Sequence, residues 1–368
     1  MSTTPRQHSI RDDRRVSMSD VARLAGVSAQ TVSRVSNGSA GVIDATRQQV
    51  IAAMNELGYR PNSAARALKR GSFRTIGVIL FTLSTTGNVR TLEAIAARAA
   101  EEDYAITLIP VAAPTQAGVR GAFSRLNELA VDGIIVIMEV HLLDAATVSL
   151  PPGVHAVVVD SDASDGFSVI DTDQADGARK AVEHLLDLGH STVWHVAGPS
   201  ASFASERRVN AWRSVLSSRG CAEPALLRGD WSADSGYLAG LTLAASDCTA
   251  VFVANDQMAL GVLRAFHEKG IRVPEDVSIV GFDDIPDSTS FSPPLTTVHQ
   301  DFAEVGRRCV DKVLKQMREN STEPGLDLVP TRLVVRESTA ARRRRSVRAS
   351  VGLSGDHGGN SWTQVDRK

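Results

Sequence analysis

The chain has 368 residues, of which 43% are hydrophobic and 22% charged, as in ordinary globular proteins. At roughly 150 residues per domain, this length indicates two or three domains. The sequence has no run of about 18 apolar residues and no apolar segment near its start, so neither a transmembrane helix nor a secretory signal is predicted. Its cysteines, Cys221, Cys248 and Cys309, form no CxxC pair or zinc-like spacing, which argues against a disulfide framework and favours the cytoplasm.

The net charge of −2 hides an uneven distribution. Residues 1–71 carry +6, residues 341–368 carry +5, and the long segment between them carries −13. A basic head on an acidic body indicates that only the head approaches a polyanion, although a pair of solvated basic tails would give the same numbers.

The basic head begins with the signals of two short helices. Ser17 and Asp20 have the spacing of a capping box before a helix over 18–25, and Gly26 can supply the tight turn after it. Ser28 is placed to cap a second helix over 29–36, which Asn37-Gly38 ends. This succession of helix, short glycine turn and helix predicts a helix-turn-helix.

A third helix is predicted over 45–57, capped by Asp44 and closed by Gly58, with Val50, Ile51, Met54 and Leu57 as its apolar stripe. The outward side of the second helix carries Ala29, Gln30, Ser33 and Arg34, which can reach base edges and phosphates in a major groove. A generic three-helix bundle with a polar face is the alternative.

The segments DVARLAGVSAQTVSRVSNG and TRQQVIAAMNELGYRPNSAARALKRG resemble the DNA-binding head of the LacI/GalR family of bacterial transcription regulators. The resemblance implies a disordered basic arm over 1–15, a helix-turn-helix domain over 16–61 and a hinge helix over 62–71 that folds when a dimer sits on DNA. Leu68 matches the leucine that such regulators insert into the minor groove, where an apolar side chain can wedge open a base step. The implied operator contacts are Ser28, Ala29, Gln30, Thr31, Ser33, Arg34, Asn37, Asn62, Ala65 and Leu68.

Residues 72–340 alternate between short apolar runs and Ala- and Leu-rich stretches. This pattern is typical of βαβ units, so parallel sheets covered by helices are expected, in two units. The predicted strands are 75–80, 106–110, 133–138, 155–160, 192–197, 250–254 and 277–281, and the predicted helices are 92–102, 177–188, 211–219 and 257–269.

Polar and aromatic side chains follow these runs, at the sheet edge where open α/β sheets bind ligands. Carboxylates, an amide and a guanidinium can hold several sugar hydroxyls, and aromatic faces can stack on the C–H face of a pyranose. A phosphate site would need more cations and a purine site fewer carboxylates, so a neutral polyhydroxylated ligand is predicted. Each residue also has a structural alternative, because a strand-end Asp often caps a helix and a lone Trp is usually core. The candidates are Asp160, Arg208, Trp231, Asn255, Asp283 and Phe302.

Four segments of the body resemble the lactose-repressor branch of the family: HVAGPSASFASERRVNAW, GDWSADSGY, VANDQMALGVLRA and VGFDDIPDSTSFSPPLTTVHQDF. The resemblance implies a periplasmic-binding-protein-like core, with subdomain one at about 74–172 and 300–328 and subdomain two at about 173–299 and 329–340. It also implies that the six candidates line a galactoside pocket. Ala204 stands where the branch has Ser, and Ser202 or Ser205 are possible substitutes, so galactosides are expected first and glucosides such as cellobiose second.

Residues 341–368 carry no leucine heptads and are rich in Gly, Ser and Arg, which predicts a disordered basic tail and a homodimer without a tetramerisation seam.

No GxGxxG, Walker A, GxSxG or HExxH motif occurs, so no enzyme, cofactor or metal site is predicted. Asp283 and Asp284 do not suit a glycosidase, since adjacent residues of an extended segment point to opposite faces. A secreted sugar-binding protein shares the body fold but lacks the head. The sequence therefore predicts a sugar-responsive repressor that binds palindromic operator DNA and no membrane.

Overall fold

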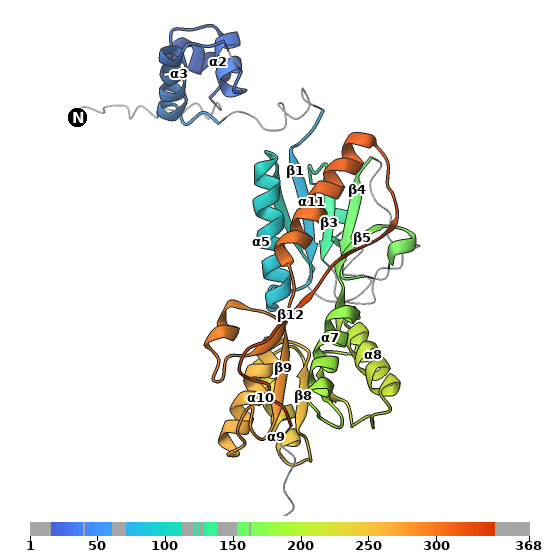
Figure 1. Ribbon diagram of the computed structural model, residues 1–368. Coiled ribbons are helices and arrows are strands. Elements are labelled where there is room, and N and C mark those ends of the chain that lie inside the picture. The colour runs from blue at the N-terminus through green and yellow to red at the C-terminus, as the bar shows by residue number, and fades with distance from the viewer. Residues whose placement is uncertain are drawn as a thin grey trace, which may run out of the picture.

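The computed structural model describes residues 16–39, 41–60, 71–111, 121–122, 124–125, 129–137, 153–161 and 163–342. Within them lie a three-helix head and a core of two lobes, each built on a six-stranded sheet (Figure 1). Among the helices of these residues, none combines the length and apolar character needed to cross a bilayer.

The head consists of α1 (Met18–Leu24), α2 (Ala29–Ser36) and α3 (Asp44–Glu56). The predicted capping box is present, because Ser17 Oγ accepts a hydrogen bond from the Asp20 amide and the Asp20 carboxylate accepts one from the Ser17 amide. Ser28 caps α2 by accepting from the Thr31 amide at 3.1 Å. Gly26 and Gly38 have φ of +59° and +67°, the left-handed conformation that glycine adopts without strain. The two predicted caps and turns of the helix-turn-helix are confirmed.

Two details of the third helix were wrong. Asp44 is the first helical residue rather than the cap, which is Ile43 and makes no side-chain bond. Ile51 is 45% exposed, and Ala53 takes its place beside Val50 and Met54 in the small core of the head. The physical reason is spacing: positions 50, 53, 54 and 57 follow the 3.6-residue period, whereas 51 lies about 100° from 50.

The first lobe holds a parallel sheet in the order β11-β5-β4-β3-β1-β2. Helices α5 and α11 pack together over one face, against Ile76, Val78 and Leu80 of β1 (Figure 1). The opposite face packs in a second cluster that includes Ile79 and Ile134. The elements are β1 (Thr75–Leu80), α5 (Thr86–Glu101), β2 (Ala105–Pro110), β3 (Gly133–Ile137), β4 (His155–Val159), η1 (Ala163–Asp165), β5 (Ser168–Thr172), α11 (Phe302–Glu319) and β11 (Gly325–Val329).

The second lobe holds a sheet in the order β12-β10-β9-β8-β6-β7. Helices α7 and α8 cover one face around Trp212, and α9 and α10 cover the other (Figure 1). One edge differs from the all-parallel prediction, because β12 pairs antiparallel with β10. The elements are α7 (Gln174–Asp187), β6 (Trp194–Ala197), α8 (Phe203–Ser218), β7 (Leu227–Arg228), α9 (Ala233–Ala244), β8 (Ala250–Val253), α10 (Asp256–Glu268), β9 (Ser278–Asp283), η2 (Pro286–Ser290), β10 (Thr296–His299) and β12 (Arg332–Val334).

The chain passes between the lobes three times: from β5 to α7, from β10 to α11 and from β11 to β12. Arg342, which the sequence analysis places in the tail, is fixed on the second lobe: its amide donates to the Leu188 carbonyl at 2.9 Å and its guanidinium to Ser191 Oγ at 2.8 Å. The predicted arm over 1–15 and the tail from 343 lie outside the described residues.

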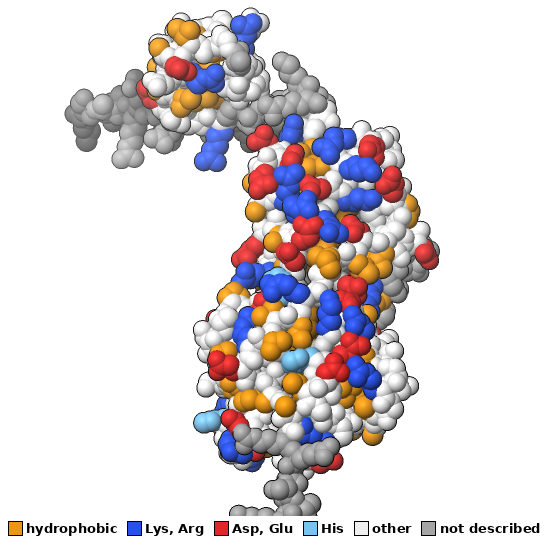
Figure 2. Space-filling view, viewed as in Figure 1, with side chains coloured by type: hydrophobic (Ala, Val, Ile, Leu, Met, Phe, Trp, Pro, Cys, Tyr) orange, Lys and Arg blue, Asp and Glu red, His pale blue; other side chains and the backbone are white. Residues whose placement is uncertain are grey.

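Acidic and basic side chains are interspersed over the face of the first lobe that Figure 2 shows, where α5 and α11 lie. Arg98 reaches from α5 to Asp311 of α11 at 2.8 Å, and Arg307 pairs with Glu304 at 2.6 Å. This face therefore presents no continuous basic surface to a polyanion.

Close packing of α9 on α10 depends on glycine. A Cβ on Gly261 would lie 1.9 Å from the Ala233 carbonyl oxygen and 2.5 Å from the Tyr237 amide nitrogen, both backbone atoms. We expect Gly261→Ala to lower the free energy of unfolding by about 1–3 kcal/mol or more, because the two helices must separate. Urea denaturation measures this. Gly121→Ala is the control, since that helical glycine meets nothing within 4 Å; an equal loss in both variants would contradict the packing argument.

Candidate functional site

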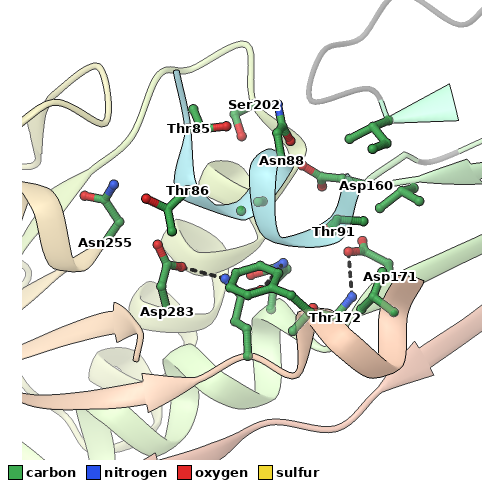
Figure 3. A pocket seen from close by; sticks show the side chains of 18 of the residues that line it. Thr85, Thr86, Asn88, Thr91, Asp160, Asp171, Thr172, Ser202, Asn255 and Asp283 are labelled. Atoms are coloured by element: carbon green, nitrogen blue, oxygen red, sulfur yellow. Dashed lines mark hydrogen bonds between the residues drawn. The ribbon is translucent and has the colours of Figure 1, made fainter. Parts of the chain in front are cut away.

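A cavity of about 90 Å³ lies between the two lobes, at the carboxyl ends of their strands. At about 10–15 Å³ per water molecule, it has room for several waters. All six residues predicted to bind ligand line it: Asp160, Arg208, Trp231, Asn255, Asp283 and Phe302. Figure 3 shows several of these side chains directed toward a common space.

Strand ends and backbone turns position three of these six residues. Asp160 directly follows β4, Asp283 ends β9, and Trp231 follows β7. Their φ angles are +53°, +116° and +74°, in the left-handed region that residues other than glycine rarely adopt. Such backbone strain concentrates at functional sites, where it aims a side chain that regular structure would point elsewhere.

Arg208 is buried in the wall of the cavity, with 3% of its surface exposed. Its Nε and Nη2 donate to Gln174 Oε1 at 2.9 and 2.7 Å, and its Nη1 donates to the Ala254 carbonyl. The guanidinium also lies over the Phe282 ring, 3.8 Å from the centroid. These contacts hold its planar donor fork in one orientation.

Two glutamines that the sequence analysis missed complete this wall. Gln174 Nε2 donates to Gln300 Oε1 at 3.2 Å, and Gln300 Nε2 donates to the Asp283 carboxylate at 2.6 Å. A continuous chain of buried hydrogen bonds thus runs from Arg208 to Asp283. Both glutamines are neutral and stand where the chain crosses between lobes, so no charge pattern in the sequence marked them.

Asn255 lines the cavity and also caps a helix. Its Oδ1 caps α10 by accepting from the Met258 amide at 2.9 Å, while its Nδ2 donates to the Trp231 carbonyl at 3.0 Å. Trp231 in turn lies close against Gly198, where a Cβ would come within 2.3 Å of the indole. Phe302, the first residue of α11, places its ring beside Gly87 at the start of α5.

The neighbouring acids Asp256 and Asp284 are not among the residues that line the cavity. Asp256 is fully buried and accepts hydrogen bonds from the Ile285 amide, Ser288 Oγ and Thr297 Oγ1, so it supports the loop after β9. Burial raises the pKa of its carboxyl to about 6. Asp284 accepts from His299 Nδ1 at 2.9 Å and from Arg336 at 2.5 Å, and it lines an adjoining hollow of about 440 Å³ that shares Asp283, Gln300 and Phe302 with the cavity.

At the position of the Ser of the related branch, Ala204 lines the cavity without a hydroxyl. Of the two possible substitutes, Ser202 also lines the cavity and is 4% exposed. Ser205 is fully buried and is not among the lining residues. Of the two serines, Ser202 is therefore the one that lines the cavity.

In the head, the predicted DNA-contacting residues divide into two groups. Ser28 and Thr31 bond to each other at the cap of α2, with their hydroxyl oxygens 2.9 Å apart, and Ser33 Oγ accepts from Asn37 Nδ2 at 3.3 Å. Ala29, Gln30 and Arg34 are exposed on α2. Asn62, Ala65 and Leu68 lie outside the described residues.

The described residues contain no group of three or more His, Cys, Asp or Glu that could hold a metal ion. The site is thus a helix-turn-helix head joined to a two-lobed core with a polar, partly aromatic cavity. This combination defines a class of protein: a DNA-binding regulator with a ligand-binding core.

Comparison with known proteins identifies the family. Residues 17–62 match the model of bacterial regulatory proteins of the lacI family, and residues 182–339 match a periplasmic binding protein-like domain. The chain is 37% identical to the lactose operon repressor of Escherichia coli K12 over 329 residues, which cover 89% of this chain and 91% of that one. It is 32% identical over 336 residues to the transcriptional repressor PurR of Pasteurella multocida, covering 88% and 98% of the two chains.

Solved structures of LacI-family regulators have the same fold as this chain. A lac repressor dimer bound to operator and the anti-inducer ONPF superposes with a TM-score of 0.79 at 36% identity, covering 89% of this chain and all of that one. The complex of the regulator CelR with cellobiose has a TM-score of 0.66 at 29% identity, covering 88% and 100%. The chain belongs to the LacI family of bacterial transcriptional regulators and is not an enzyme.

The ion pair between Asp171 and Arg207 joins the lobes beside the cavity. Asp171, on β5, is 2% exposed, and Arg207 reaches it from α8 while also donating to the Ser161 carbonyl at 2.8 Å. Burial raises the pKa of Asp171 to about 6, and the Arg207 charge opposes that rise.

We expect Arg207→Met to lower the free energy of unfolding by about 3–5 kcal/mol at pH 8, because it leaves a buried carboxylate without its cation. In the folded variant the pKa of Asp171 stays raised, whereas in the unfolded chain the pKa of this carboxyl is about 4. The free energy of unfolding of the variant therefore falls as pH rises from about 4 to the folded-state pKa. Urea denaturation at pH 8 and pH 5.5 should give a smaller loss at the lower pH. The double variant with Asp171→Asn should recover stability at pH 8; the same loss at both pH values would contradict the assignment.

Proposed function

We propose that this chain is a homodimeric repressor of sugar-utilisation genes, released from a palindromic operator by a neutral sugar, with galactosides as the first expectation. The observation that carries the proposal is the convergence of all six candidate residues on one cavity between the lobes. Two carboxylates, an amide and a guanidinium suit hydroxyl groups that both donate and accept hydrogen bonds. Trp231 and Phe302 supply faces for the C–H surface of a ring.

The charges around the cavity support a neutral ligand. The carboxylates of Asp160 and Asp283 line the same cavity as the guanidinium of Arg208, while Asp171 is paired with Arg207. A phosphate would meet two carboxylates there, and a purine would need fewer of them. The relatives include the transcriptional repressor PurR as well as lactose operon repressors, so family membership alone does not fix the ligand.

A glucoside is the second candidate. Ala204 leaves the cavity wall without the hydroxyl that the galactoside-binding branch carries, and the similar CelR structure is a complex with cellobiose. Titration with matched galactosides and glucosides distinguishes the two.

For the head, we propose that Ala29, Gln30 and Arg34 read operator bases. Gln30 stands in the first turn of α2, the end of a recognition helix that approaches base edges. Ser28, Thr31, Ser33 and Asn37 fix and flank that helix. The proposed hinge over 62–71, with Asn62, Ala65 and Leu68, connects the head to the core.

Arg208→Ala tests the sugar response. We expect a protein that still binds operator but is no longer released by sugar, because truncating one partner of a buried polar network costs about 2–5 kcal/mol of affinity. Calorimetric titration and operator release in a gel-shift assay measure this. Arg213→Ala is the matched control, since Arg213 lies on the same helix and pairs with Glu223 outside the cavity. Normal induction of the Arg208→Ala variant would show that the pocket assignment is wrong.

Gln30→Ala tests the head. We expect it to change the preference among operator variants by about 1–3 kcal/mol at one base pair, because a bidentate base contact is lost. Sugar affinity should stay unchanged. Gln48→Ala, an exposed glutamine on α3, is the control. A uniform loss of affinity across all operator variants would instead indicate a backbone contact.

A further inference from the structure

The first lobe contributes a wall of the cavity that the six candidates do not describe. Thr86, Asn88 and Thr91 come from the first turns of α5, and Thr172 ends β5. Figure 3 shows these side chains around the same space as Asp160 and Asp283. This surface, Thr86, Asn88, Thr91 and Thr172, is called the threonine wall below.

Three residues of the threonine wall are buried, Thr86 is half-buried, and all four have hydrogen-bonding capacity to spare. Thr91 and Thr172 are each 4% exposed, and neither hydroxyl is hydrogen-bonded to another described residue. Asn88, 5% exposed, donates its Nδ2 to the Thr82 carbonyl at 3.1 Å, which leaves its Oδ1 as an acceptor. Thr86 Oγ1 accepts from Gln257 of the other lobe, which leaves its hydroxyl hydrogen to donate.

Buried polar groups in native proteins are nearly always hydrogen-bonded. A group bound against the threonine wall therefore has to offer donors and acceptors. Three aliphatic side chains also reach the cavity from this lobe, Ile137, Val159 and Val305, and they belong to the hydrophobic cluster under α5 and α11. An alkyl or aryl group placed over them would leave the hydroxyls and the amide oxygen without partners.

In the proposed function, three of the four hydrogen-bonding candidates lie on the opposite wall, while Asp160 follows β4 of the first lobe. Arg208, Asn255 and Asp283 all come from the second lobe. The edge of the ring that they do not hold, with whatever substituent it carries, faces the first lobe.

We propose that the threonine wall selects effectors that are hydroxylated on the side facing the first lobe: a free sugar or a glycoside whose substituent is itself a sugar, and not an alkyl or aryl glycoside. This inference rests on the proposed sugar response and specifies the class of sugar derivative. Sites built to hydrogen-bond a hydroxyl discriminate strongly against analogues that lack it, because their own polar groups are then left unpaired.

The test is calorimetric titration of the full-length protein with two matched series. The galactose series is galactose, lactose, isopropyl galactoside and nitrophenyl galactoside; the glucose series is glucose, cellobiose and the corresponding isopropyl and nitrophenyl glucosides. In the series that binds, the hydroxylated members should bind at least about tenfold more tightly than the isopropyl and nitrophenyl members, which corresponds to one or two buried hydrogen bonds.

Variants assign the preference to the wall. Thr91→Val and Thr172→Val keep the side-chain shape but remove the hydroxyl, and each should reduce the preference about fivefold or more by weakening the hydroxylated members. Thr91→Ser keeps a hydroxyl and should retain the preference. Thr107→Val, on β2 outside the cavity, is the control. Thermal unfolding and operator binding without sugar verify that each variant is folded.

Two results would overturn the inference while leaving the sugar response intact. One is an isopropyl or nitrophenyl glycoside that binds as tightly as the hydroxylated members of its series. The other is an unchanged preference in both valine variants. If no compound of either series binds, the proposed sugar response itself is wrong, and the inference falls with it.

Discussion

A buried guanidinium at the junction of the lobes is the constraint on which the cavity depends. An arginine side chain stays charged under all physiological conditions, so burying it requires acceptors around the whole donor fork. Arg208 finds them in Gln174 Oε1 and the Ala254 carbonyl, with the Phe282 ring against its face. One acceptor stands at the start of α7 and the other directly after β8, so satisfying this one group fixes two elements of the second lobe against each other.

The same hydrogen bonds connect the cavity to the segments that cross between the lobes. Gln174 is the first residue of α7, after the first crossing, and Gln300 lies in the second crossing, between β10 and α11. The two side chains are hydrogen-bonded to each other. Gln300 then holds the Asp283 carboxylate at 2.6 Å. A group that displaces or adds to any bond of this chain acts on the crossing segments directly, which gives a ligand in the cavity a physical route to the relative position of the lobes.

Much of the second-lobe wall was predictable from sequence because parallel strands have a simple rule. The carboxyl ends of neighbouring strands meet at one edge, so polar residues after apolar runs converge, as Asn255 and Asp283 do in the second lobe; Asp160 lines the same cavity from the edge of the first lobe's sheet. The rule does not distinguish two residues that are adjacent in the sequence. Asp256 follows Asn255 but supports the loop after β9, and only the folded structure shows which of the two side chains faces the cavity.

The remaining wall lay beyond sequence reasoning for identifiable reasons. Thr86, Asn88 and Thr91 are neutral residues in the first turns of a helix, where such side chains usually serve as caps or surface. Asp171 interrupts the apolar run of β5, and its partner Arg207 lies on the other lobe, so neither residue signals the other along the chain. Contacts between lobes depend on how two sheets meet, and the periodicity of either sheet carries no information about that.

These two walls have a consequence for regulation. A ligand shifts an equilibrium between conformations only by its difference in affinity for them. A ligand held by one lobe alone binds equally well however the lobes are arranged and therefore changes nothing. In this cavity the charged and amide groups of the second lobe face the hydroxyls of the first, and Gln257 already bonds across to Thr86. A ring with hydrogen-bonding groups on both edges completes both walls only when the lobes are placed as they are here, so its binding free energy is tied to this arrangement. On the proposed sugar response, the polarity of the threonine wall therefore couples a hydroxylated ligand to this arrangement of the lobes as well as filtering the ligand, because a sugar that contacts only the second lobe does not distinguish one arrangement from another.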